Sequence, residues 1–307
     1  MTPMLPRQRS LSANTLGWIW VSPWLIGFIV FLAVPTAMSL YYSLCDYPLL
    51  EPPLFVGLSN YRRMFDDPVF WIVLRNTAIY AATSIPLGTA AALIIAALLN
   101  NKVRGVGFFR AAVFLPTVVP LAASAMIWLW ILNGELGLLN AIINPILKPF
   151  GLHGPAWIGF RGTGDKAWAM PALVLMSLWG VGQSVVIYLA ALQDVPESLH
   201  EAASIDGVGP IRRFYHITLP LISPVILFNV IVAIIGSSQV FGAPYIMTQG
   251  GPDRATYFYS MYMFDKAFTY GQMGYASAMA WVQLVIVLVL TALTFIVSRK
   301  LVFYRSA

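Results

Sequence analysis

Long apolar stretches alternate with short polar segments along the whole of this 307-residue chain. Six of the stretches are long enough to cross about 30 Å of hydrocarbon, which takes about 20 helical residues. They cover residues 17–42, 76–99, 111–132, 167–192, 221–247 and 271–298. The first is longer than the apolar run of about 7 to 15 residues in a signal peptide, so we expect it to stay as an anchor. The pattern predicts an all-α membrane protein with six transmembrane helices.

The composition agrees with this pattern, because 59% of the residues are hydrophobic and only 10% are charged, with a mean hydropathy of +0.77. Soluble domains are usually more polar. No stretch is long and polar enough for a separate soluble domain. We expect one membrane domain over residues 17–298, with cytoplasmic tails at 1–16 and 299–307. Cys45 is the single cysteine, so the chain cannot form an intramolecular disulfide or a multi-thiolate metal site.

Lysine and arginine predict the orientation, since short cytoplasmic segments are enriched in them. The segments on the side of the two termini hold ten: Arg7, Arg9, Lys102, Arg104, Arg110, Arg212, Arg213, Arg299, Lys300 and Arg305. The longer loops on the other side hold eight: Arg62, Arg63, Arg75, Lys148, Arg161, Lys166, Arg254 and Lys266. Both termini are therefore predicted to be cytoplasmic. The net charge of +6 raises the question of a nucleic-acid partner. The basic residues lie in clusters rather than along one face, which argues against such a partner.

None of the six predicted spans has an acidic or basic residue in its interior. Proton-coupled carriers and voltage sensors usually need such groups, which argues against both classes. A sodium-coupled secondary carrier can instead use backbone carbonyls at broken helices, so this class remains an alternative. The chain has no G-x-x-x-x-G-K-[ST] phosphate loop, so an ATPase must be a partner. It also has no recognisable nucleophile with a base and an orienting group, which argues against an enzyme.

The most informative polar segment is the cytoplasmic loop 194–220, which reads DVPESLHEAASIDGVGPIRRFYHITLP. Its first part predicts a short helix ending at Asp206. Asp194 is placed to act as the N-cap, with Glu197 completing a capping box and Pro196 in the first turn.

The second part of the loop predicts a break and a restart. Gly207 suits the left-handed position after a helix, Pro210 suits a new helix start, and Pro220 marks the beginning of the next span. The first helix carries a small, weakly apolar surface made by Leu199, Ala202, Ala203 and Ile205. Such a surface lets a partner backbone come close, although an ordinary connector would also explain the caps and breaks.

A zinc-protease H-E-x-x-H motif is incomplete at His200-Glu201, because position 204 is serine. The remaining histidines, His153 and His216, have no ligand-like spacing to His200. We therefore predict no metal site.

In its residues and in their spacing, the loop 194–220 resembles the EAA loop of binding-protein-dependent ABC importer permeases. The matching residues are Glu201, Ala202, Ala203, Asp206, Gly207, Phe214, Ile217, Leu219 and Pro220, and the departure is Val208 where alanine is usual. The resemblance implies that this loop forms a coupling helix that docks in a groove of the ATPase. It also implies that Glu201, Ala202, Ala203, Asp206, Gly207, Phe214, Leu219 and Pro220 take part in that coupling.

Nearly the whole chain is similar to the sugar-type branch of this family, which includes maltose and glycerol-3-phosphate permease subunits. The similar segments include Gly57-Leu58-Ser59-Asn60-Tyr61, Leu115-Pro116 with Trp128, Leu189-Ala190-Ala191-Leu192-Gln193, Gly250-Gly251-Pro252, and Gly274-Tyr275-Ala276-Ser277-Ala278. The resemblance implies a bacterial inner-membrane importer with a second homologous permease, two ABC ATPase subunits that hold ATP and Mg, and an extracytoplasmic solute-binding protein. It leaves open a non-sugar solute such as glycerol-3-phosphate.

Uncharged polar and aromatic groups in the last three spans are the candidates for the substrate pathway: Trp179, Gln183, Tyr188, Asn229, Ser237, Ser238, Gln239 and Gln283. They suit a neutral, hydroxyl-rich solute, because amides and hydroxyls bond its OH groups and aromatic faces cover its C–H surfaces. A phosphate would call for Arg or Lys. For any one residue, the alternative is a bond to a neighbouring helix or a place at the membrane interface.

Overall fold

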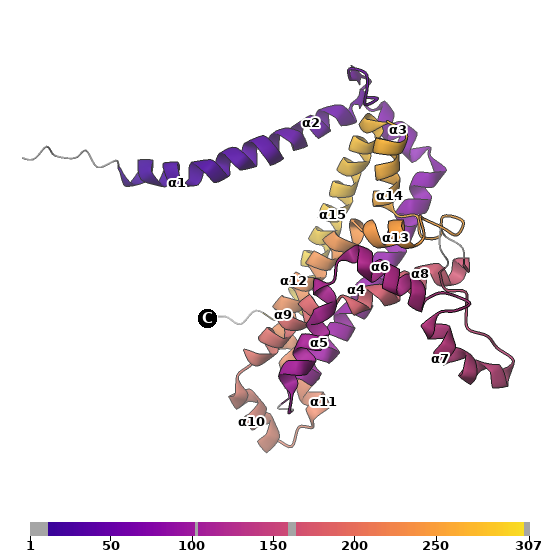
Figure 1. Cartoon of the computed structure of the whole chain (residues 1–307). Helices are drawn as coiled ribbons and strands as arrows, with labels where there is room; N and C mark the ends of the chain where they lie inside the picture. Colours follow the sequence, from indigo (N-terminus) through magenta and orange to yellow (C-terminus); the bar gives the residue numbers. More distant parts are fainter. Residues whose placement is uncertain (1–11, 102–103, 159–163, 304–307) are drawn as a thin grey trace, which may run out of the picture.

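The computed structural model describes residues 12–101, 104–158 and 164–303, and these are almost entirely helical (Figure 1). The first half of the chain contains α1 (Ala13–Phe28), the π-helical η1 (Ile29–Ala33), α2 (Val34–Ser43), β1 (Cys45–Asp46), β2 (Leu54–Phe55), α3 (Ser59–Phe65), α4 (Pro68–Leu99), α5 (Val106–Val118), α6 (Leu121–Ile131), α7 (Leu138–Leu147) and η2 (Lys148–Phe150). The second half contains α8 (Lys166–Trp179), α9 (Gly182–Gln193), α10 (Glu197–Ile205), α11 (Pro210–Arg213), the π-helical η4 (Phe214–Thr218), α12 (Leu219–Ser238), α13 (Gly242–Met247), α14 (Tyr259–Phe264), the π-helical η5 (Asp265–Thr269) and α15 (Met273–Leu301).

Four segments in the described residues are long and apolar enough to cross a membrane by themselves: Asn14–Ser43, Pro68–Leu99, Pro210–Met247 and Met273–Arg299. The predicted third and fourth spans are each made of two helices. The pair α5 and α6 is bent by 102°, and the pair α8 and α9 by 49°. The structure thus has four to six candidate spans, depending on whether each bent pair crosses as one.

The bend in the third predicted span lies at Val119 and Pro120. A proline disfavours the helical conformation of the residue before it, and Val119 is extended, with φ −70° and ψ 129°. Pro116 removes one further backbone donor from the last turn of α5. The stretch 111–132 is uniformly apolar, so its hydropathy gave no sign of this bend.

The bend in the fourth predicted span lies at Gly180 and Val181, between α8 and α9. At the start of α9, Gly182 is in close contact with α5. A Cβ at this position would lie only 2.5 Å from the carbonyl oxygen of Val113. Glycine here lets the two helices pack at backbone distance.

The fifth span begins well before the predicted residue 221, because α11, η4 and α12 run on without a break. The π turn explains how the helix passes Pro220, which has no N–H to donate. The amide of Leu219 bonds to the carbonyl of Phe214, five residues back, so the turn is widened directly before the proline.

Three clusters of buried side chains form the core, and all three include residues of α4. One packs α4 against α6 and α8, a second packs α4 against α9 and α12, and the third packs α4 against α3, α14 and α15. By contrast, α1 extends away from the bundle (Figure 1), and the span that begins there is not buried in this chain. The boundaries of the predicted tails differ from those in the structure, since α1 begins at Ala13 and α15 continues to Leu301. Residues 1–11 and 304–307 of these tails lie outside the described residues.

A carboxylate network joins α14, η5 and α15 to the beginning of α4. Asp67 caps α4 through the amide of Val69 at 2.9 Å, and it also accepts bonds from the hydroxyls of Tyr262 and Tyr275, the latter at 3.0 Å. Burial alone raises the pKa of the Asp67 carboxyl, but these donors and the nearby charge of Lys266 together lower its pKa below the ordinary value. The network holds best while this carboxyl is ionised.

Candidate coupling loop and solute cavities

The loop predicted to couple the chain to an ATPase forms the short helix α10, at the end of the bundle opposite α3 (Figure 1). Its N-cap is Pro196, and no side chain caps the helix. The predicted capping box is therefore wrong. Helix α9 extends as far as Asp194, which is its C-cap residue. Asp194 is therefore not free to cap α10.

The end of α10 agrees with the prediction for Gly207, which has φ +70°. The amide of Gly207 bonds to Ser204 at 3.1 Å, and the amide of Val208 bonds to Ala203 at 2.9 Å. This is the Schellman pattern, in which two residues after a helix satisfy its last carbonyls. Arg213 secures the turn by donating to the carbonyl of Val208 at 3.2 Å. The space around Gly207 is open, so only its backbone conformation demands glycine.

The predicted coupling residues fall into two groups. Glu201, Ala202 and Asp206 are exposed on α10, whereas Ala203 is buried beneath it. Phe214, Leu219 and Pro220 do not lie in a loop at all, because they belong to the continuous helix of η4 and α12. Exposed apolar side chains extend the outer surface of α10 and α11, including Ile205 and Ile211.

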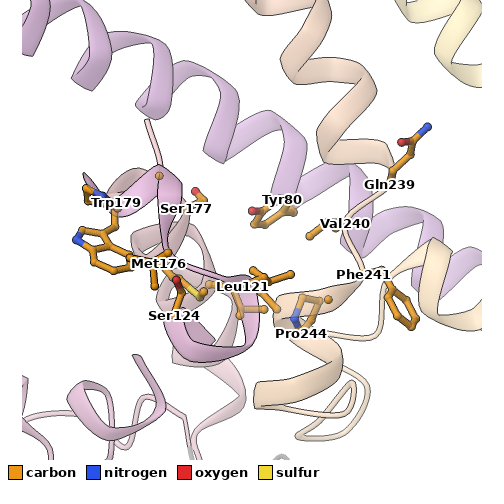
Figure 2. Close-up of a pocket in the computed structure, with 16 residues that line it drawn as sticks. Tyr80, Leu121, Ser124, Met176, Ser177, Trp179, Gln239, Val240, Phe241 and Pro244 are labelled. Carbon is orange, nitrogen blue, oxygen red and sulfur yellow. The ribbon is translucent and has the colours of Figure 1, made fainter. Parts of the chain in front are cut away.

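A first cavity, of about 430 Å³, lies where the α8–α9 bend meets the break after α12. We call it the Trp179 cavity. Trp179, Met176 and Ser177 line one side of it, and Val240 and Pro244 line the other (Figure 2). Gln239 also lines it, but in this view its amide points away from the cluster.

A second cavity, of about 480 Å³, shares Tyr80, Ser177, Gly180 and Val240 with the first and lies between α4, α9 and α12. We call it the Tyr188 cavity. It includes three predicted pathway residues, Tyr188, Asn229 and Ser237.

The hydroxyl of Tyr188 is buried and has no hydrogen-bond partner within 3.5 Å among the described residues, although the side chain of Thr89 on α4 is close enough to influence it. Within the described part of the chain, Asn229 and Ser237 donate only to carbonyls of their own helix, Val225 and Ile234. An unpaired buried hydroxyl costs about 1–3 kcal/mol, so this cavity holds polar groups that a solute could satisfy.

The remaining candidates are distributed elsewhere. Gln283 and Gln239 line a third cavity of about 520 Å³, between the end of α12 and α15. Gln283 also donates to the carbonyl of Ser238 at 2.6 Å, so it ties α15 to α12. Ser238 bonds within its own helix, to Ile235, and Gln183 is exposed on α9; neither lines one of these cavities.

The contribution of α4 was not predicted from the sequence, nor were Ser177 of α8 and Ser184 of α9. Tyr80, Ser84 and Thr89 of α4 line the Tyr188 cavity together with Ser177 and Ser184. A signal was present, because Tyr80, Ser84 and Gly88 repeat every four residues and so share one face of a helix.

Chemically, the two cavities offer hydroxyls, two amides and aromatic rings, and none of the described residues that line them is charged. Such walls can exchange hydrogen bonds with a neutral polar solute but cannot neutralise a charged one.

Comparison with known proteins is consistent with this geometry. Residues 84–303 match the family described as binding-protein-dependent transport system inner membrane component. The chain belongs to this family. Among its relatives, the probable ABC transporter permease protein YesP of Bacillus subtilis (strain 168) is 37% identical over 98% of this chain and 96% of that protein. The lactose transport system permease protein LacF of Rhizobium radiobacter is 35% identical over 92% of this chain and 94% of that protein.

The fold of this transport-system membrane component is also found in a solved structure. That structure is a bacterial ABC transporter involved in the import of the acidic polysaccharide alginate, with a TM-score of 0.80 over 94% of this chain and 96% of that chain. At 21% identity, the likeness concerns the fold alone. The predicted family and the inner-membrane location are confirmed, and membership in the family favours an importer subunit over a sodium-coupled carrier.

Proposed function

We propose that this chain is the permease subunit of an ATP-driven importer for a neutral carbohydrate, and that the Trp179 and Tyr188 cavities form part of the solute pathway. The observation that carries the proposal is the Tyr188 cavity, whose polar lining is uncharged and whose Tyr188 hydroxyl lacks a partner. A hydroxyl-rich solute supplies both donors and acceptors to such a lining. The name of the lactose permease LacF supports the same class of solute.

A charged solute such as glycerol-3-phosphate is the weaker alternative. Its phosphate would call for a cation in the pathway, and the described lining of these cavities has none. A second permease subunit would then have to supply it.

Energy for transport comes from outside the chain in this proposal. Six spans with cytoplasmic termini bring α10 to the cytoplasmic face, where it docks in the ATPase groove as the coupling helix. Two ATPases bind ATP and Mg, a second permease completes the pathway, and an extracytoplasmic binding protein delivers the solute. The exposed surface of α10, including Glu201, supports this role.

Tyr188→Phe tests the cavity, because it removes one hydroxyl and keeps the ring. The free transporter should be as stable as wild type or slightly more so, since the lost hydroxyl had no partner. Uptake of labelled sugar by the assembled transporter in vesicles, at solute levels below saturation, should fall about two- to tenfold, which corresponds to a hydrogen bond of about 0.5–1.5 kcal/mol.

Two controls make the result interpretable. The purified chain by itself should neither hydrolyse ATP nor transport. Tyr41→Phe, the same chemical change at an exposed tyrosine of α2 outside the cavities, should leave uptake unchanged. Unaltered uptake in Tyr188→Phe would remove the Tyr188 cavity from the pathway, and uptake without any ATPase would contradict the importer.

A further inference from the structure

Helix α7 has its polar side facing inward and its apolar side facing outward. Asn140 is buried and donates to the carbonyls of Gly134 and Pro155 at 2.8 and 2.9 Å. Its side-chain oxygen accepts from the indole of Trp157 at 2.9 Å. On the next turn, Asn144 accepts from the amide of Gly154 at 2.7 Å. Both amides therefore bind the segment that follows the helix.

Every exposed residue of α7 is apolar, and together they occupy one continuous helical face: Leu138, Ala141, Ile142, Pro145 and Ile146. Ile142 is 58% exposed and Ile146 is 64% exposed. Leu136, Phe150 and Leu152 continue this apolar surface on either side of the helix. In water such a face would be unfavourable, because it leaves contiguous apolar area uncovered.

The lengths of the neighbouring helices place α7 at the level of the lipid. The 13 residues of α5 rise about 20 Å before the 102° bend, which is less than the hydrocarbon thickness of about 30 Å. The chain therefore turns aside into α6 within the depth of the bilayer. Six residues separate α6 from α7, so under the proposed orientation the apolar face of α7 lies at the depth where acyl chains surround the protein.

We propose that α7 is an interfacial helix that embeds its Leu138–Ile142–Ile146 face among the acyl chains of the extracytoplasmic leaflet. The exposed Lys148 after α7 suits this position, because a long cation can reach the lipid phosphates while its stem stays in the apolar layer. The apolar face itself has no polar side chain, unlike a typical protein interface with its hydrogen bonds and polar rim. In Figure 1, α7 lies at the edge of the molecule, on the side away from α1.

This anchoring has a consequence for the solute cavities. Helix α7 connects α6 to the segment leading into α8, and both α6 and α8 line the Trp179 cavity. Embedding α7 in one leaflet holds the two walls at a fixed depth. The inference rests on the proposed orientation of the permease.

Spin labels on the assembled transporter in phospholipid vesicles test the proposal. Buried Cys45 is first replaced by serine, and single variants Ile142→Cys, Ile146→Cys and Glu135→Cys are labelled. Molecular oxygen concentrates in the bilayer, whereas a water-soluble nickel chelate stays outside it. The labels at 142 and 146 should collide several-fold more with oxygen and several-fold less with nickel than the label at the exposed polar position 135.

Two other outcomes would overturn the proposal. Low collision rates with both reagents at 142 and 146 would mean that a protein partner covers the face. High nickel rates that fall when the binding protein is added would mean that the face is aqueous and docks that protein. Sugar uptake is measured in the same vesicles, so a loss of the proposed function is distinguished from a misplaced α7.

Discussion

Replacing Gly207 by alanine should weaken docking of the ATPase through the backbone alone. Gly207 occupies the left-handed region with φ +70°, and a Cβ there would meet no atom within 4 Å. The cost is therefore the conformational penalty of about 1–2 kcal/mol for a residue with a Cβ, without any steric clash. If the intact turn is the form that docks, its population falls by about 5- to 30-fold.

The matched control is Gly209→Ala, two residues further along the same loop. Gly209 has φ −63° and ψ 160°, and its surroundings are equally open. Alanine adopts this conformation without strain, so docking should be unchanged or slightly stronger. Asparagine tolerates the left-handed region better than alanine does, so Gly207→Asn should have an intermediate effect.

The assay is the ATPase concentration that gives half-maximal association with the permease in membranes, measured together with solute-stimulated hydrolysis. For Gly207→Ala this concentration should rise about 5- to 30-fold, whereas the amount of permease in the membrane should stay the same. If the alanine variants at 207 and 209 bind the ATPase equally well, then the Schellman turn does not position the coupling helix.

Three further predictions concern stability and topology. Gly182→Ala should lower the thermal midpoint of unfolding, because the new Cβ would lie 2.5 Å from a carbonyl oxygen of α5. Gly236→Ala is the control and should not lower it, since a Cβ there would meet no atom within 4 Å. Equal midpoints for the two variants would exclude close packing at 182. Because its partners lower the folded-state pKa of Asp67, that carboxyl stabilises the fold above its ordinary pKa near 4, and stability is lost as the pH falls through the lowered value. Thermal melts from pH 7 to 2 should therefore show a smaller acid loss in Asp67→Asn than in wild type. A reporter fused after Ser204 should behave as cytoplasmic and one near Gly154 as external, and the reverse pattern would invert the proposed orientation.

The helical segments were predictable from hydropathy because each predicted span is built of helices, with short breaks such as residues 119–120 and 239–241. The bends were not, because Pro120 lies at a break between two helices whereas Pro86 and Pro171 lie inside unbroken ones. The left-handed Gly207 was predictable from local chemistry alone. The capping box at Asp194 was not predictable from local chemistry, because the preceding helix α9 extends to this residue.

The solute candidates, too, were predictable only in part. Tyr188, Asn229 and Ser237 line one cavity, because each is a polar residue on a helix that faces α4. Gln183 faces outward, and hydropathy cannot tell the two sides of a uniformly apolar helix apart. The face of α4 that completes the cavity was overlooked, although the four-residue spacing of Tyr80, Ser84 and Gly88 marks it in the sequence.

The π turn at Phe214–Thr218 makes the direction of the coupling loop depend on a single residue. Each residue of an α-helix turns the chain by about 100°, so deleting one residue here would remove the π turn and rotate everything before it by about that angle. Helix α10 would then be swung around the axis of α12 while both helices kept their own sequences. Within a family of related chains, this short segment is therefore where a length change of one residue would redirect the cytoplasmic surface without altering the membrane core.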